Sequence, residues 1–432
     1  MLAAATLLGL VFAPAPAEAA SGSAPEADVN PDAPAGAGAA EVVPSEASTA
    51  LPDSGGSDAL SQPPPSDWRI GAFVDASYAL NTNFPDNGVY RGTATTPRAN
   101  EFSIPAAGLY LVKDADDESP WWIELGVHAG SGVDALASSE LAVAGPDVAY
   151  VGPEVFKHLA RANGGVVFDS GTSLGAGLFG SPIGIGGFWS KDNWNYTPSW
   201  ESNGAAFYLA GARVTQELPK GFSAEAWVVN GWQINADANH VPSYLAALNW
   251  NGAGRRGGDW FLSQQVYFGP EGPTVKPEAW RVHVDSQITY QREDWGVGFV
   301  WDYGRDGPDA IADSPRATWT GGALFLRGRV FDSKHAQAFV AARPEVWLDP
   351  NGRIFGAEQT LVSATGTLDW RLYDHVLARV EYRYDHSTAK DGYFYANGAT
   401  NPDAEGLAKN QHNVFFALTA MFEHRFRQRP AL

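Results

Sequence analysis

Residues 280–291 read WRVHVDSQITYQ, and this stretch decides the fold class. Its apolar side chains, such as Val282 and Val284, fall on one face of an extended strand, while polar ones, such as His283 and Asp285, fall on the other. A helix would scatter both sets around its circumference, whereas a strand keeps them apart. The stretch is therefore predicted to be a β-strand with one apolar and one polar face.

The same two-residue alternation recurs from Trp68 onward. It is clearest in residues 295–303, 361–372 and 376–386, and clusters of Gly, Pro, Asn and Asp separate the alternating segments. About sixteen candidate strands follow from this pattern. They lie near residues 68–80, 100–112, 121–130, 147–156, 165–175, 205–217, 222–233, 241–250, 259–268, 280–291, 295–304, 317–331, 336–348, 358–372, 376–386 and 413–426.

The predicted connections alternate in length along the chain. Residues 292–294 and 332–335 form tight turns, whereas 81–99 and 176–204 form long loops. A transmembrane barrel has this asymmetry, with short turns on its periplasmic side; a soluble two-sheet sandwich has alternating side chains without it. Several Trp residues near strand ends also suit a membrane interface. We therefore predict an all-β fold, a closed antiparallel transmembrane β-barrel of about 16 strands, within a range of roughly 14 to 18.

Composition excludes several classes of protein. The chain of 432 residues has a net charge of −20 and no cysteine. Such an acidic chain repels phosphate backbones, so no nucleic-acid partner is expected. Without cysteine there is no disulfide framework, zinc–thiolate site or thiol nucleophile. After residue 20, no uninterrupted apolar run approaches the roughly 18 residues that a spanning helix needs, which excludes a helical membrane protein.

The N-terminal part of the chain differs from the rest. Residues 1–20 contain an apolar stretch followed by small residues that suit a cleavage site, so they are predicted to be an export signal peptide. Residues 21–66 are rich in Ala, Pro, Ser, Gly and acid, and are predicted to be a disordered acidic tether in the periplasm. Residues 67–432 then form the barrel. Since residues 1–67 hold nine acidic and no basic side chains, a net charge of −11 remains for the rest.

The polar strand faces are predicted to line the barrel interior, because charge that faces lipid is costly. A charged wall has two interpretations, a transverse field across a water-filled pore or a salt-bridged plug in a closed lumen. A barrel of about sixteen strands leaves an aqueous channel, which favours the pore. The Arg-rich late strands indicate a preference for anions, whereas the net charge of −11 over residues 68–432 indicates a preference for cations. The ion preference therefore stays open. The predicted pore-lining residues are Arg213, Glu225, Arg281, His283, Asp285, Arg327, Arg329, Arg343, Glu345, Asp369, Arg371, Arg379, Glu381, Arg383 and Asp385.

The long loop at residues 176–204 is too apolar and too rich in Trp for a purely solvated segment. We predict that it folds into the barrel mouth or lumen and narrows it; its rings could also stack on sugars. The alternative is that it packs on neighbouring loops above the membrane. The side chains predicted to form this constriction are Phe179, Phe188, Trp189, Trp194, Tyr196 and Trp200.

No catalytic or metal-binding arrangement is evident in the sequence. His240 lies three residues before Ser243, and His283 two before Asp285, but neither spacing assembles a nucleophile, a base and an orienting group. No phosphate-binding glycine loop or H-E-x-x-H motif occurs. The acidic turn at residues 114–117 is best explained as solvated. We predict no enzymatic activity, no cofactor and no metal.

Short motifs give a further indication. They are Asn100-Glu101-Phe102-Ser103, Ser181-Pro182-Ile183-Gly184 with Asn193, Asn195 and Tyr196, then Val229-Asn230-Gly231-Trp232 with Asp237 and Asn239, and Phe268-Gly269-Pro270-Glu271. By their order and spacing, residues 68–426 resemble the bacterial β-barrel porins described as OmpL-like. The resemblance implies an outer-membrane barrel with a porin role and names no solute.

The sequence thus predicts an outer-membrane porin that passes small hydrophilic solutes and ions by passive diffusion. Its expected partners are outer-membrane lipid and these solutes. The sequence does not define the oligomeric state, and a homo-oligomer is one of the possibilities. Two alternatives remain: a secreted β-sandwich that binds carbohydrate through its aromatic loops, and a closed outer-membrane barrel with a structural or adhesive role.

Overall fold

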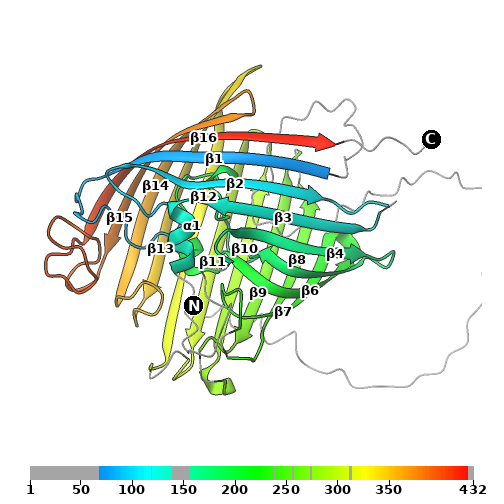
Figure 1. The fold of residues 1–432 in the computed structure, drawn as a ribbon, viewed down its shortest axis with the longest axis horizontal. Coiled ribbons are helices and arrows are strands. Elements are labelled where there is room, and N and C mark those ends of the chain that lie inside the picture. Colours follow the sequence, from blue (N-terminus) through cyan, green and yellow to red (C-terminus); the bar gives the residue numbers. More distant parts are fainter. Residues whose placement is uncertain are drawn as a thin grey trace, which may run out of the picture. The chain divides into compact units, whose positions relative to one another are not determined.

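A computed structural model describes residues 68–426, except 118, 139–155, 238, 255–256, 273–274 and 311–313. Across these residues, sixteen strands form one closed antiparallel barrel in which each strand pairs with its neighbours in sequence (Figure 1). The predicted signal peptide (1–20) and tether (21–66) lie outside the described residues. The closed ring confirms the predicted fold class.

The element bounds show how regular the barrel is. The strands are β1 (Trp68–Asn81), β2 (Phe102–Lys113), β3 (Trp121–Ala129), β4 (Leu159–Val167), β5 (Thr172–Gly180), β6 (Tyr208–Leu218), β7 (Phe222–Val229), β8 (Ser243–Ala253), β9 (Asp259–Gly269), β10 (Arg281–Gln291), β11 (Trp295–Asp306), β12 (Ala317–Ser333), β13 (Ala336–Asp349), β14 (Gln359–Leu372), β15 (Val376–Ser387) and β16 (Asn410–Phe426). The helical segments are α1 (Ser131–Ser138), η2 (Ser190–Asp192), α3 (Trp200–Gly204), η3 (Pro219–Gly221) and η4 (Pro277–Ala279). Among the described residues, no helix is long and apolar enough to cross a bilayer.

The barrel closes where its first strand meets its last. Trp68 pairs with Phe426 at one end of this seam, and Asn81 pairs with Asn413 at the other (Figure 1, blue and red strands). Closure leaves no sheet edge, so the strand backbones hydrogen-bond to neighbouring strands on both sides. The hydrocarbon core of a bilayer offers no water to backbone groups, which is why only such closed sheets cross it with strands. The alternative of a two-sheet sandwich was therefore wrong.

The outer face of the barrel is apolar. Val380 is 45% exposed and Leu368 is 38% exposed, whereas their neighbours Arg379 and Asp369 are buried inside. The exposed set is rich in Leu, Val, Phe and Trp over most of the strands. A band of this kind is covered by lipid in a transmembrane barrel, with the polar side chains of each strand turned to the lumen. The predicted assignment of the two faces is confirmed.

Short and long connections alternate as predicted. The turns at 292–294 and 334–335 are short, whereas the loops at 82–101 and 181–207 are long. Because the strands alternate in direction, all short turns lie at the barrel end that also holds Trp68 and Phe426.

One strand prediction was wrong, and another lies outside the described residues. The predicted strand at 147–156 falls mostly on residues that the structure does not describe, and the fourth described strand is β4 (Leu159–Val167). The predicted strand at 165–175 spans the turn between β4 and β5, where Gly171 has a positive φ of 75°. The cause is the glycine content of this hairpin, because a glycine carries no side chain to mark either face of a strand.

Candidate functional site

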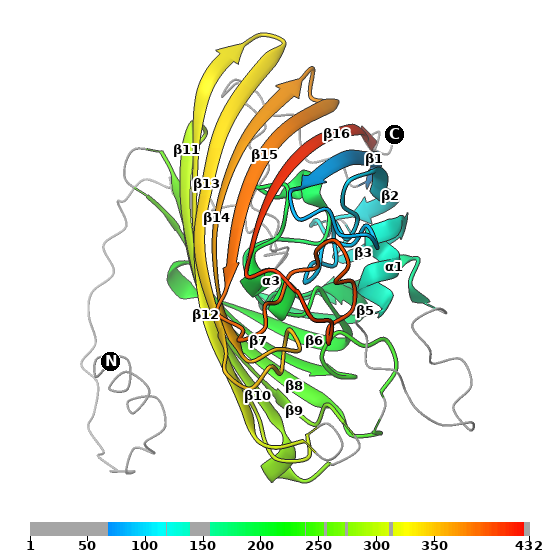
Figure 2. The same ribbon diagram turned by 90° about the vertical axis from the view of Figure 1, so that its left-hand side faces the viewer.

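The connection between β5 and β6, residues 181–207, folds into the barrel; we call it the inward loop. Figure 2 shows its short helix α3 inside the ring of strands. Its side chains are buried against strands from all around the ring. Phe188 packs on His128 of β3 at 5.3 Å between ring centroids, and Trp189 packs on Phe73 of β1 at 5.0 Å. The loop therefore spans the lumen.

Glu381, on the inward face of β15, is the main acceptor for the loop backbone. Its carboxylate accepts hydrogen bonds from the backbone N–H of Tyr196 at 2.6 Å and of Thr197 at 2.9 Å, and another from the Thr197 hydroxyl. Thr367 of β14 donates to the same carboxylate at 2.6 Å. These groups are fully buried, so the charge of Glu381 is solvated by the loop instead of by water.

Three arginines on β13 and β15 hold the loop through its carbonyl oxygens. Arg343 donates to the Thr197 carbonyl at 2.6 Å, and Arg383 donates to the Pro198 carbonyl at 2.6 Å. Arg379 donates to the carbonyls of Ser190 and Asn193. Each guanidinium also faces a carboxylate on the wall: Arg343 faces Glu345, Arg379 faces Asp369 and Arg383 faces Asp385. Each of the three arginines therefore joins the backbone of the inward loop to a carboxylate of the barrel wall.

Two further strands of the ring, β10 and β11, contact the loop through an amide and two glycines. Gln287 of β10 donates to the Pro182 carbonyl at 2.9 Å. On β11, Gly296 lies against Trp194 and Gly298 against Ile185. A Cβ added at Gly296 would lie 2.4 Å from the Trp194 ring, so a side chain there would push the loop out of place.

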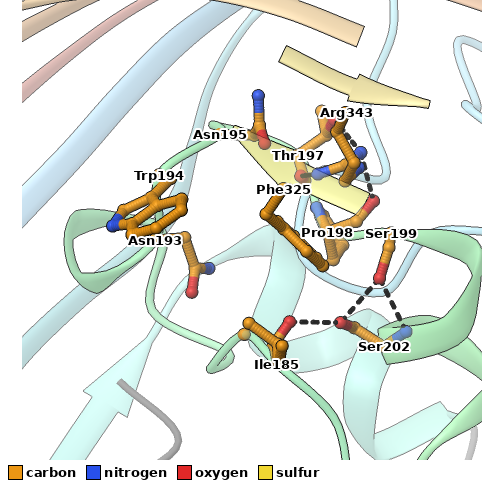
Figure 3. A pocket seen from close by; sticks show the side chains of 11 residues that line it. Ile185, Asn193, Trp194, Asn195, Thr197, Pro198, Ser199, Ser202, Phe325 and Arg343 are labelled. Carbon is orange, nitrogen blue, oxygen red and sulfur yellow. Dashed lines mark hydrogen bonds between the residues drawn. The ribbon is translucent and has the colours of Figure 1, made fainter. Parts of the chain in front are cut away.

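The space between loop and wall is small. A cavity of about 10 Å³, bordered by Trp194, Ser199, Phe325 and Arg343, holds no more than about one water (Figure 3). In Figure 3 the Ser199 hydroxyl bonds to Ser202, whose own hydroxyl donates to the carbonyl of Ile185. The inward loop therefore packs closely against β12 and β13 at this cavity.

The structure brings together only part of the predicted wall. Glu381 and the three arginines contact the loop as described, and Trp200 donates to two further carboxylates, its backbone N–H to Glu345 and its indole N–H to Asp385 at 3.0 Å. Asp285 lies beside Glu201 of the loop, and Asp369 pairs with Arg379. The other inward-facing predicted residues are Arg213, Glu225, Arg281, His283, Arg327 and Arg371.

Two predicted residues are placed differently. Arg329 lies at the short-turn end of β12, beside a register shift, and pairs with Glu293 at 2.7 Å and with Asp332 at 3.1 Å, away from the loop. Phe179 belongs to β5 and not to the loop; it faces inward and packs on Trp227 at 5.2 Å. The remaining aromatic residues predicted for the constriction all lie in the inward loop and are buried or half-buried.

Sequence reasoning missed some inward groups. Asp75 on β1 accepts a hydrogen bond from Ser190 at 2.6 Å, and Asp302 on β11 is fully buried in the lumen. Both carboxylates lie between outward apolar neighbours, such as Val74 or Trp301, so the alternation already placed them inside.

One group of carboxylates could hold a cation. Glu201 of α3, Asp285 of β10 and Asp302 of β11 each place a carboxylate oxygen within 4.8 Å of the others. Burial, helped by the nearby Asp285, raises the pKa of Glu201 to about 8. This group could not be recognised from the sequence, because its members lie far apart in the chain.

The fold defines the class of protein: a transmembrane β-barrel with a loop folded into its lumen. The sequence profile of the family described as "Putative beta-barrel porin-2, OmpL-like" matches residues 67–423, and the chain belongs to this family. It is a porin of the bacterial outer membrane, and its family points to a non-enzymatic channel that serves small solutes.

Solved structures with a similar fold are also porins or channels. The anion-selective porin from Comamonas acidovorans is 12% identical, with 83% of this chain and 100% of that chain covered and a TM-score of 0.48. The outer membrane channel DcaP of Acinetobacter baumannii is 10% identical, with 84% and 99% covered and a TM-score of 0.49. OprB of Pseudomonas putida is 11% identical, with 83% and 94% covered and a TM-score of 0.47. None of the curated protein sequences matches the chain.

Proposed function

We propose that this porin passes small hydrophilic ions by diffusion and that the inward loop is its gate. The observation that carries the proposal is the docking of the loop across the lumen, where Glu381 and Arg383 hold its backbone. Because these groups are buried, we infer that ions pass when the loop shifts and uncovers them. No covalent chemistry enters this function, since permeation needs only a path and a favourable wall.

A reversible cross-link tests the gate. Asn195 donates to the Thr367 hydroxyl at 2.7 Å, so the double variant N195C/T367C places two thiols near each other, and the chain has no other cysteine to interfere. We expect the oxidised variant to lose most of its conductance in planar bilayers, and dithiothreitol to restore it, because the disulfide fastens the loop to β14. The single variants N195C and T367C serve as controls. Equal conductance before and after reduction, with the disulfide verified by thiol labelling, would rule out a moving gate.

Ion preference follows from the groups that a shifted loop uncovers. The fully buried wall carboxylates around the loop outnumber the guanidinium groups of Arg343, Arg379 and Arg383. Such a wall favours cations. The carboxylates are Asp75, Asp285, Asp302, Glu345, Glu381 and Asp385. In a potassium chloride gradient across a bilayer, the zero-current potential is expected to have the sign of a potassium-preferring channel; the opposite sign contradicts the proposal.

A further inference from the structure

The carboxylates of Glu201, Asp285 and Asp302 differ from the other buried acids of the lumen. Asp385, Glu345 and Asp306, for example, each face an arginine within 4.0 Å. No lysine or arginine in the described part of the chain makes an ion pair with any of the three clustered carboxylates, although all are at most 1% exposed. Several carboxylate charges gathered in a dry site without a cation are strongly unfavourable.

In this cluster, particular carboxylate oxygens have no hydrogen-bond donor. The hydroxyl oxygens of Ser199 and Ser202 lie 3.1 and 3.2 Å from Oε2 of Glu201, whereas Oε1 has no hydrogen-bond partner. Gln287 donates to Oδ1 of Asp285, which leaves Oδ2 without a donor, and Nε2 of His283 lies 3.4 Å from Oδ2 of Asp302. Neighbouring polar groups therefore hold Glu201 and Asp285 in place and leave one oxygen of each toward the cluster, as residues that hydrogen-bond to metal ligands do.

A second and independent observation comes from His283. Its side chain is 1% exposed, neither ring nitrogen has a hydrogen-bond partner, and Nε2 lies 3.4 Å from Oδ2 of Asp302. A buried polar ring without hydrogen bonds costs about 1–3 kcal/mol. The imidazole of His283 and the carboxylate oxygens beside it both lack hydrogen-bond partners. This points to a bound group that both would contact, directly or through water.

The chemistry of the donors selects the ligand. Three carboxylates supply hard oxygen donors, and Ca²⁺ accepts six to eight such ligands in flexible geometry, with water completing the shell. Gly184 lies against Glu201, since a Cβ there would lie 2.3 Å from Oε1, so only glycine lets the loop backbone approach this carboxylate so closely. The donors come from the inward loop and from two adjacent wall strands, so one ion would join all three segments.

We propose that Glu201, Asp285 and Asp302 bind a Ca²⁺ ion that fastens the inward loop to β10 and β11. The binding of the ion does not depend on whether the inward loop is a gate. Only the effect of the ion on permeation rests on the proposed function.

Terbium luminescence tests the site in the full-length chain, folded in detergent and stripped with EDTA. Tb³⁺ takes the same oxygen ligands as Ca²⁺, and Trp200, next to Glu201 in the chain, can sensitise its emission. We expect saturable emission at about one ion per chain, displaced by Ca²⁺. The variants E201Q and D302N are expected to lose at least tenfold in affinity. The variant E271Q is the matched control, because Glu271 is equally buried but its oxygens are bonded to Tyr267, Ser243 and the backbone N–H of Trp232.

The outcomes are decisive in each direction. Heat-modifiable gel mobility shows that each variant has folded, and isothermal calorimetry with Ca²⁺ measures the same site without terbium. A folded wild-type barrel without displaceable emission, as expected if protons and not a cation occupy the cluster, overturns the proposal. Wild-type affinity in both E201Q and D302N also overturns it. If terbium binds but the N195C/T367C cross-link leaves conductance unchanged, the gate fails and the ion site stands.

Discussion

Replacing residues 183–202 with a short Gly-Ser linker is expected to raise single-channel conductance several-fold. The segment holds the loop residues that Glu381, Arg343, Arg379 and Arg383 bind, and its rings pack against walls on different sides of the lumen. Without it, water fills the barrel and solvates the freed charges, and a barrel of about sixteen strands leaves an aqueous channel when nothing plugs it.

Planar-bilayer recording measures the single-channel conductance of the deletion variant and of the wild type under the same conditions. Heat-modifiable gel mobility and a β-type circular dichroism spectrum verify that the shortened chain has closed into a barrel. A folded deletion variant with wild-type conductance would show that ions take a route that avoids the loop, and the gate proposal would fail.

The substitution Glu381→Ala is expected to destabilise the barrel by roughly 2–4 kcal/mol and to increase the fraction of time that the channel is open. The change removes a charged acceptor that takes two backbone N–H groups and a hydroxyl from the loop, and hydrogen bonds to charged groups are the stronger class. Denaturant unfolding measures the first effect and single-channel recording the second.

A matched control separates the two effects. Asp306 of β11 is also a buried carboxylate, and it pairs with Arg281 at 2.8 Å and with Arg353 at 3.0 Å, neither of which belongs to residues 181–207. The substitution Asp306→Ala should lower stability and leave the open fraction near that of the wild type. If both variants open the channel equally, opening reflects general loosening and not release of the inward loop.

Strand positions were predictable wherever side chains alternate. For β10, β14 and β15 the predicted bounds differ from the observed ones by one residue or less at each end. The pattern failed at β4 and β5, because segments such as LARANGGVV and TSLGAGLFG carry too few side chains to mark a face. The alternation of short and long connections was nevertheless predicted correctly, because it depends only on the number of residues between strands.

The site was predictable in part. Alternation places Arg379, Glu381 and Arg383 on one inward face, and the Trp-rich composition of the loop indicates that it needs cover. The partners of these charges could not be predicted, because they are backbone groups such as the carbonyls of Thr197 and Pro198, which every sequence possesses. The grouping of Glu201 with Asp285 and Asp302 likewise depends on how the loop returns through the barrel.

Recognition of main-chain atoms has a practical consequence for redesign. Arg343, Arg379 and Arg383 bind carbonyl oxygens, so this part of the anchorage does not depend on the side chains of the segment, unlike the hydrogen bonds that Ser190 and Asn195 donate. Proline is the main exception at Tyr196 and Thr197, whose amide protons are needed by Glu381. Single substitutions in the loop could therefore change conductance and ion selectivity without any change to the strands of the barrel.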